Sequence, residues 1–140
     1  MLHYITTFQA PFMYVSDKFL DLTGALESFH RETINPKQVH FKSRVHDILK
    51  RYNSTYNGIL KIRSASKLAE KIKNFRNDFT HAHPVLSQES KKHLDTHYIN
   101  EKLTLIIACA LLSEVGVPVK ELKSCIEETT LYTQIKYKLR

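Results

Sequence analysis

Apolar residues recur along the chain in steps of three and four, the spacing that places them on one face of an α-helix. The first such stripe predicts a long amphipathic helix that ends before Pro36, and it consists of Phe12, Val15, Phe19, Leu22, Leu26 and Phe29. A second stripe predicts a helix from about Gln38 to Tyr52, with an inward face of Val39, Val45, Ile48 and Leu49. The following segment, Asn53–Gly58, is rich in turn-forming residues, and we expect an exposed loop there.

A third stripe predicts a helix from about Ser64 to Phe79, with a core face of Leu68, Ile72, Phe75 and Phe79. Pro84 is expected to stop this helix, because the residue before a proline avoids the helical region. A fourth helix is predicted from about Ser90 to Val115, and Gly116 with Pro118 ends it.

The stretch from Leu103 to Leu112 within the fourth helix is apolar on nearly all sides. We therefore expect this helix to be central in the fold or shared with another molecule, in a dimer that forms through this helix and the face of Asn77 and His81. A last helix from about Val119 to Thr130 packs Leu122 and Ile126, and the tail to Arg140 is either a short strand or more helix.

Only three glycines occur in 140 residues, too few for the tight turns of a many-stranded β fold, so the chain is predicted to be all-α. The length and the 42% hydrophobic content fit one globular domain rather than two. Cys109 and Cys125 each lie in a predicted helix beside apolar residues, which favours buried thiols over a disulfide.

The net charge of +7 is concentrated in the middle of the chain. Between Lys37 and Arg76, eleven Lys or Arg residues face two acids, which gives +9, whereas the rest of the chain sums to −2. Such a basic surface attracts polyanions, of which nucleic acid is the commonest inside cells. A solvated face that only aids solubility is the alternative interpretation.

The longest nearly apolar run has about half of the ~20 residues that a membrane-spanning helix needs. No signal-peptide pattern follows Met1. We therefore expect a cytoplasmic protein with no membrane partner.

A polar cluster lies at the end of the third predicted helix. On a wheel of 100° per residue, Asn77 and His81 point away from the core face, and Arg76 lies on the flank. An imidazole can move the proton of a ribose 2′-hydroxyl, and a guanidinium can stabilise a crowded phosphorane, so the cluster suits metal-free cleavage of RNA. Ordinary polar residues at a solvated helix end are the alternative. Arg76 lies about 140° from His81, so the two meet only if the helix unwinds before Pro84 or if a partner subunit completes the site.

The sequence from Lys71 to Pro84 resembles the signature of HEPN domains, in which an arginine and a polar residue are followed by a histidine after four to six intervening positions. Here the interval is four to His81 or six to His83. The segment Phe19–Arg31 resembles the opening helix of the ApeA-like branch of that family, and Leu111–Val117 resembles the end of its fourth helix. The likeness spans about residues 15 to 118.

The resemblance implies a four- to five-helix up-and-down bundle over residues 1–140, with a core of about 12–130. It also implies a homodimer that brings two Arg-to-His motifs to one cleft, and a metal-independent endoribonuclease that leaves a 2′,3′-cyclic phosphate and needs no cofactor. The expected role is anti-phage defence in a bacterium or archaeon. In ApeA-like proteins this domain usually forms the C-terminal part of a longer chain, so an N-terminal domain absent from this chain is an expected partner.

Carried over by position, the catalytic residues are Arg76 as phosphate clamp, Asn77 as orienting residue and His81 as acid-base group, with His83 as the alternative histidine. The residues expected to support them near the cleft are Glu27, His30 and Arg31. The residues expected to bind RNA along the same helix are Lys67, Lys71 and Lys73.

Two other functions compete with this one. The first is a HEPN module without catalytic activity that serves in dimerisation or RNA binding. Separately, Tyr52 and Tyr56 in the basic segment either stack on RNA bases or join the core. The second is a metal-binding regulatory domain, whose candidate ligands are His81, His83, His93, His97 and Glu101. We expect no metal site, because histidines on a polar helix face are usually only solvated.

Overall fold

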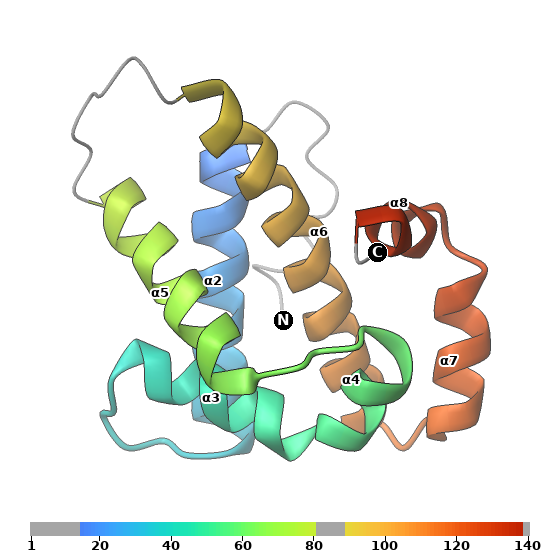
Figure 1. The fold of residues 1–140 in the computed structure, drawn as a ribbon. Coiled ribbons are helices and arrows are strands. Elements are labelled where there is room, and N and C mark those ends of the chain that lie inside the picture. Colours follow the sequence, from blue (N-terminus) through green and yellow to red (C-terminus); the bar gives the residue numbers. More distant parts are fainter. Residues whose placement is uncertain (1–14, 81–88, 139–140) are drawn as a thin grey trace.

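The computed structural model describes residues 15–80 and 89–138, and within these ranges it contains helices and no strand. The helices are α2 (Val15–Thr33), α3 (Phe41–Arg51), α4 (Asn53–Ile59), α5 (Ala65–Thr80), α6 (Glu89–Glu114), α7 (Val119–Glu127) and α8 (Thr130–Lys138) (Figure 1). The all-α prediction is confirmed. Phe12, which was expected in the first helix, lies outside the described residues.

Helix α2 is the centre of the bundle and packs against α3, α5 and α6. Figure 1 shows α2, α5 and α6 running alongside one another, while α3 and α4 lie across one end and α7 and α8 flank α6. The stripe predicted for α2 is buried at Phe19, Leu22, Leu26 and Phe29. The predicted core face of α5 packs inward through Ile72 and, more shallowly, through Leu68, Phe75 and Phe79.

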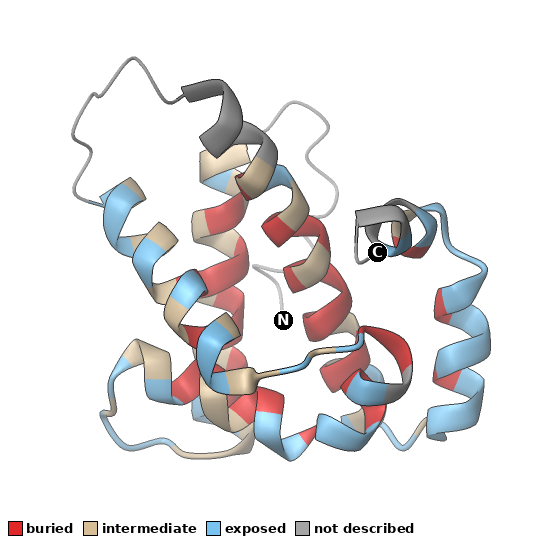
Figure 2. Ribbon diagram, viewed as in Figure 1, coloured by how far each residue is buried: buried red, intermediate tan, exposed pale blue. Residues whose placement is uncertain are grey.

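The middle of helix α6 is buried on nearly all sides. The consecutive residues from Leu103 to Ile107 are each at most 4% exposed (Figure 2). Helices α2, α4, α7 and α8 of the same chain cover it. The helix is therefore central, and helices of the same chain bury the apolar surface of its middle part.

The end of α6 follows the prediction closely. Gly116 has φ 87°, the left-handed conformation that favours glycine after a helix. The Val117 amide donates to the Leu112 carbonyl at 3.0 Å, and the Gly116 amide donates to the Ser113 carbonyl at 3.1 Å, as in a Schellman motif. The tail was predicted to be either a short strand or more helix. It is helical through Lys138, which excludes the strand.

The segment expected to be an exposed loop is a helix instead, α4, and that prediction was wrong. Tyr56 is 1% exposed, and its hydroxyl donates to the Ile106 carbonyl oxygen at 2.8 Å. Tertiary contacts with α6 and α7 thus override the turn-forming tendency of the segment. Tyr52 and Tyr56 are both buried, so the interpretation in which they stack on bases is excluded.

Helix α3 begins at Phe41, three residues later than predicted. The guanidinium of Arg44 donates to the carbonyl oxygens of Asn35 and Lys37, at 3.3 and 2.8 Å. These bonds hold the segment before α3 in a non-helical path.

The two cysteines are free thiols in different environments. Cys109 is fully buried, and burial raises the pKa of its thiol to about 12. Cys125 is exposed, which corrects the expectation that both are buried. Helix α7 buries the stripe of Leu122 and Ile126, and Cys125 lies off that stripe. In the described part of the chain, no helix is long and apolar enough to cross a bilayer.

Candidate functional site

Arg76 lies near the end of α5, where α2, α3 and α5 meet. Its Nη2 donates to Glu27 Oε2 on α2 at 3.0 Å. Its Cζ lies 4.1 Å from the centre of the Phe41 ring on α3, a cation–π contact. The side chain is 31% exposed. Arg76 is therefore held on two sides while part of it still faces solvent.

The Glu27 carboxylate is surrounded by guanidinium groups. Besides Arg76, Arg31 Nη2 donates to Glu27 Oε1 at 2.9 Å, and Arg44 Nε lies 3.8 Å from the same oxygen. Three positive side chains thus converge on a carboxylate that is 21% exposed. Opposite charges at these distances attract strongly where water is partly excluded, so Glu27 fixes the position of Arg76.

Arg44 is 1% exposed and connects the ends of α2 and α3. In addition to its two carbonyl acceptors, its Nη1 contacts His30 Nδ1 at 2.9 Å. A guanidinium can only donate, so His30 Nδ1 accepts and carries no proton. His30 Nε2 therefore carries the proton and donates to Asp47 Oδ2 at 3.1 Å.

These hydrogen bonds give His30 a structural role. Its ring is fully buried and both nitrogens are engaged, so it cannot reach a substrate. Of the supporting residues predicted from the sequence, Glu27 and Arg31 lie in the cluster around Arg76, and His30 joins it through Arg44.

Sequence reasoning missed Arg44, Phe41 and Asp47. A signal for Arg44 was present, because it precedes Ile48 by four residues and so lies on the apolar face of its helix. A charged residue in a buried stripe is rare unless it is paired. No pattern in the sequence indicated Phe41.

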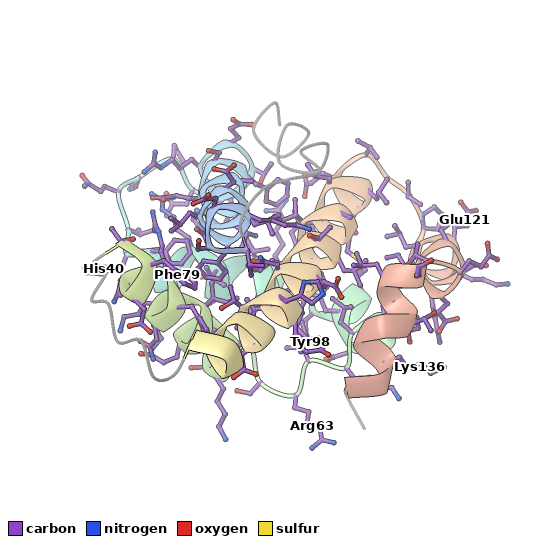
Figure 3. All side chains as sticks on the ribbon, turned by 90° about the horizontal axis from the view of Figure 1, so that it is seen from above. His40, Arg63, Phe79, Tyr98, Glu121 and Lys136 are labelled. Atoms are coloured by element: carbon purple, nitrogen blue, oxygen red, sulfur yellow. The ribbon has the colours of Figure 1, made fainter. Side chains whose placement is uncertain are left out.

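Asn77 is exposed, as predicted, and lies beside a pocket between α3 and α5. The pocket has a volume of about 400 Å³ and is lined by His40, Phe41, Lys42, Ser43, Lys73 and Asn77. In Figure 3, His40 and Phe79 are labelled on the side of the molecule where α5 lies, opposite Glu121 and Lys136. The pocket adjoins Arg76, because Phe41 contributes to both.

The basic surface is partly neutralised by acids. Glu70 binds Lys42 and Lys73, and the hydrogen bond from Lys42, followed by that from Lys73, holds the pKa of this carboxyl below its usual range. Arg51 pairs with Glu114 at 3.1 Å.

Lys67 and Lys71, predicted to bind RNA, are exposed on α5. Burial, and then the charge of Lys71, lowers the pKa of Lys102 on α6. Within the basic segment from Lys37 to Arg76, the exposed basic residues outside the ion pairs of this structure are Lys37, Lys50, Lys61, Arg63, Lys67 and Lys71.

The two candidate catalytic histidines, His81 and His83, lie outside the described residues. Helix α5 is described through Thr80, so His81 follows it directly. Of the candidate metal ligands, His97 Nε2 contacts Glu101 Oε1 at 3.2 Å, and no group of three such ligands occurs in residues 15–80 and 89–138.

Comparison with known proteins gives one match. The family model described as Apea-like HEPN matches residues 20–121, which include most of α2, all of α3 to α6 and the beginning of α7. The matched region contains Glu27, Arg44, Arg76 and Asn77. No curated protein and no solved structure matches the chain.

Proposed function

The chain belongs to the Apea-like HEPN family, and we propose that it is a metal-independent endoribonuclease whose reaction centre is at Arg76. The family supports a nuclease or another RNA-related or defence function. The observation that supports RNA cleavage in particular is the placement of Arg76, which Glu27 and Phe41 hold next to the exposed Asn77.

The arrangement of Arg76 suits a phosphate clamp. A guanidinium has five N–H donors, and its hydrogen bond to Glu27 uses one edge of the fork. The remaining edge can bind phosphate oxygens in the bidentate manner typical of arginine. Because Glu27 and Phe41 fix the side chain beforehand, little conformational entropy is lost when a phosphate binds.

In the proposed reaction, His81 removes the proton from a ribose 2′-hydroxyl, whose oxygen then attacks the adjacent phosphorus. The 5′-oxygen of the next nucleotide leaves and takes up a proton. The products are a 2′,3′-cyclic phosphate and a 5′-hydroxyl end. Arg76 stabilises the charge on the pentacoordinate phosphorus, and Asn77 orients the phosphate or the histidine.

Incubation of the purified protein with single-stranded RNA in EDTA tests this proposal. We expect cleavage of RNA, no cleavage of the same sequence as DNA, and products with 2′,3′-cyclic phosphate ends. The His81→Ala variant should lose activity, while His83→Ala and the exposed control His97→Ala should keep it. Loss in His83→Ala but not in His81→Ala would move the acid-base role to His83. No cleavage by the wild-type chain under any of these conditions would contradict the proposal.

A second function is favoured by one specific observation, the pairing of Arg76 with Glu27, which reduces the positive charge that Arg76 presents to a phosphate. An RNA-binding or dimerisation module without catalytic turnover fits such a paired arginine. Binding of RNA without any cleavage supports this second function, and turnover excludes it.

A further inference from the structure

The reaction proposed above involves Phe41 and Asn77 but gives no role to Lys42 or Lys73, which line the pocket between α3 and α5 with them. Its volume of about 400 Å³ lies near the lower end of the ~300–1,000 Å³ typical of small-molecule sites. Such a pocket accommodates a single nucleotide rather than a helical duplex.

The residues that line the pocket combine three kinds of chemistry. Lys42 and Lys73 offer ammonium groups to an anion, Phe41 provides an apolar wall, and Asn77 offers an amide that can both donate and accept. This combination matches the phosphate, the flat base and the polar base edge of a nucleotide.

The pocket is also placed where a bound strand would continue from the reaction centre. Phe41 lines the pocket and is stacked against Arg76, and Asn77 follows Arg76 in the chain. A nucleotide in the pocket therefore lies next to a phosphate held at Arg76.

Glu70 competes with any such anion in the free protein. Its carboxylate contacts the ammonium groups of both Lys42 and Lys73. It is 38% exposed, so it can turn towards solvent when a phosphate takes its place. Removal of this carboxylate should strengthen the binding of an anion, whereas removal of a lysine should weaken it.

We propose that the pocket lined by His40, Phe41, Lys42, Ser43, Lys73 and Asn77 binds one nucleotide unit of a single-stranded RNA, adjacent to the phosphate at Arg76. Lys42 and Lys73 bind its phosphate, and Glu70 occupies these lysines in the absence of RNA. This inference rests on the proposed function, because it assigns a substrate subsite to the same reaction centre.

Fluorescence anisotropy with a labelled, short single-stranded 2′-O-methyl RNA tests the inference, since this probe cannot be cleaved through a 2′-hydroxyl. We expect Lys42→Gln to weaken binding roughly tenfold, in line with the loss of one charge-assisted hydrogen bond. Glu70→Gln should tighten binding severalfold. The matched controls are Lys136→Gln and Glu121→Gln, both exposed and on the opposite side of the molecule (Figure 3), and each should change binding by less than about twofold.

Competition distinguishes a nucleotide site from a simple anion site. Adenosine monophosphate should displace the labelled RNA from the wild-type chain and, at lower concentration, from Glu70→Gln. Inorganic phosphate should compete much more weakly, because it has no base to pack against Phe41. Equal competition by inorganic phosphate would overturn the assignment to a nucleotide.

Other outcomes also decide the inference. If Glu70→Gln weakens binding as much as Lys42→Gln does, the three charges serve the fold and the inference is wrong. Equal weakening in Lys42→Gln and Lys136→Gln would show a diffuse charge effect, which also overturns it. These results also separate failure of the pocket assignment from failure of the proposed ribonuclease function. If the variants bind RNA in the expected pattern but the wild type does not cleave RNA, the pocket assignment holds and only the catalytic role is wrong.

Discussion

At the scale of single residues, the candidate site depends on Glu27. Its carboxylate is the common partner of Arg31, Arg44 and Arg76, and it approaches Arg76 to 3.0 Å. Without it, these guanidinium groups would repel one another, and Arg76 would lose its fixed direction. Glu27 is thus a positioning residue, because it acts through Arg76 rather than on a substrate.

Replacement of Glu27 tests this role. In Glu27→Gln, the shape of the side chain is kept but its charge is lost, so Arg76 is held less firmly. We expect kcat for RNA cleavage to fall roughly 10- to 100-fold with little change in KM. Glu32→Gln, at an exposed position of the same helix, is the control and should leave kcat unchanged. A faster Glu27→Gln enzyme would instead make Glu27 an inhibitor of Arg76.

We predict that Arg44 contributes strongly to the stability of the fold, because it is 1% exposed and binds His30 and two carbonyl oxygens. Arg44→Ala leaves buried acceptors without donors, so we expect the free energy of unfolding to fall by about 3 kcal/mol. Arg31→Ala removes another arginine of the same cluster, but Arg31 is 55% exposed, so the loss should stay below about 0.5 kcal/mol. Urea denaturation of both variants measures the difference. Equal losses would contradict the buried role of Arg44.

At the scale of elements, α4 shows how tertiary contacts decide secondary structure. Seven residues are too few for a stable isolated helix, so the packing of Tyr56 against α6 must hold it. Burial, above all, raises the pKa of the Tyr56 hydroxyl, so this group stays protonated at the hydrogen bond to Ile106.

Tyr56→Phe keeps the ring and removes only the hydroxyl that anchors α4. We expect a loss of about 1 kcal/mol in the free energy of unfolding, together with faster amide hydrogen exchange in residues 53–59. The exchange of α5 amides should not change and serves as the internal control. Unchanged exchange throughout α4 would show that the hydroxyl contributes nothing to its formation.

The balance between local spacing and tertiary contacts also explains which helices could be predicted from the sequence. The stripes of α2 and α5 were readable because their apolar residues, such as Leu26 and Ile72, recur at helical spacing and are buried as expected. Helix α4 could not be predicted in this way, because its sequence is rich in turn-forming residues and the helix is stabilised by contacts with α6. A sequence pattern records local spacing, whereas that contact joins residues 50 positions apart.

The site was predictable in part for related reasons. Arg76 and Asn77 were proposed from a local motif, and the exposed position of Asn77 followed from the helical wheel. Phe41 and Arg44 were not found, because their roles arise only when α3 packs against α2 and α5. Long-range partners of this kind leave no local pattern.

At the scale of the whole molecule, the structure changes which surface can form the expected homodimer. The central part of α6 is covered by helices of the same chain, so it is not available as an interface. The face of α5 that carries Asn77 is the other surface predicted for the dimer, and we propose that two copies meet through it. Asn74, one turn before it along the helix, is exposed on this face.

Light scattering at micromolar concentration tests this dimer. We expect twice the mass of one chain for the wild type. Asn74→Arg places a bulky charge on the proposed interface and should give a monomer, while Ser124→Arg on the exposed side of α7 should remain a dimer. A monomeric wild type would contradict the homodimer, and a dimeric Asn74→Arg would exclude this face.

The central claim is that Arg76 is the phosphate clamp of a ribonuclease. Its most direct test is the rate of RNA cleavage in EDTA by Arg76→Ala relative to Arg63→Ala, which removes an exposed arginine just before α5. We expect Arg76→Ala to cut RNA roughly 100- to 1,000-fold more slowly than the wild type, while Arg63→Ala stays within about twofold. Equal rates in the two variants would contradict it.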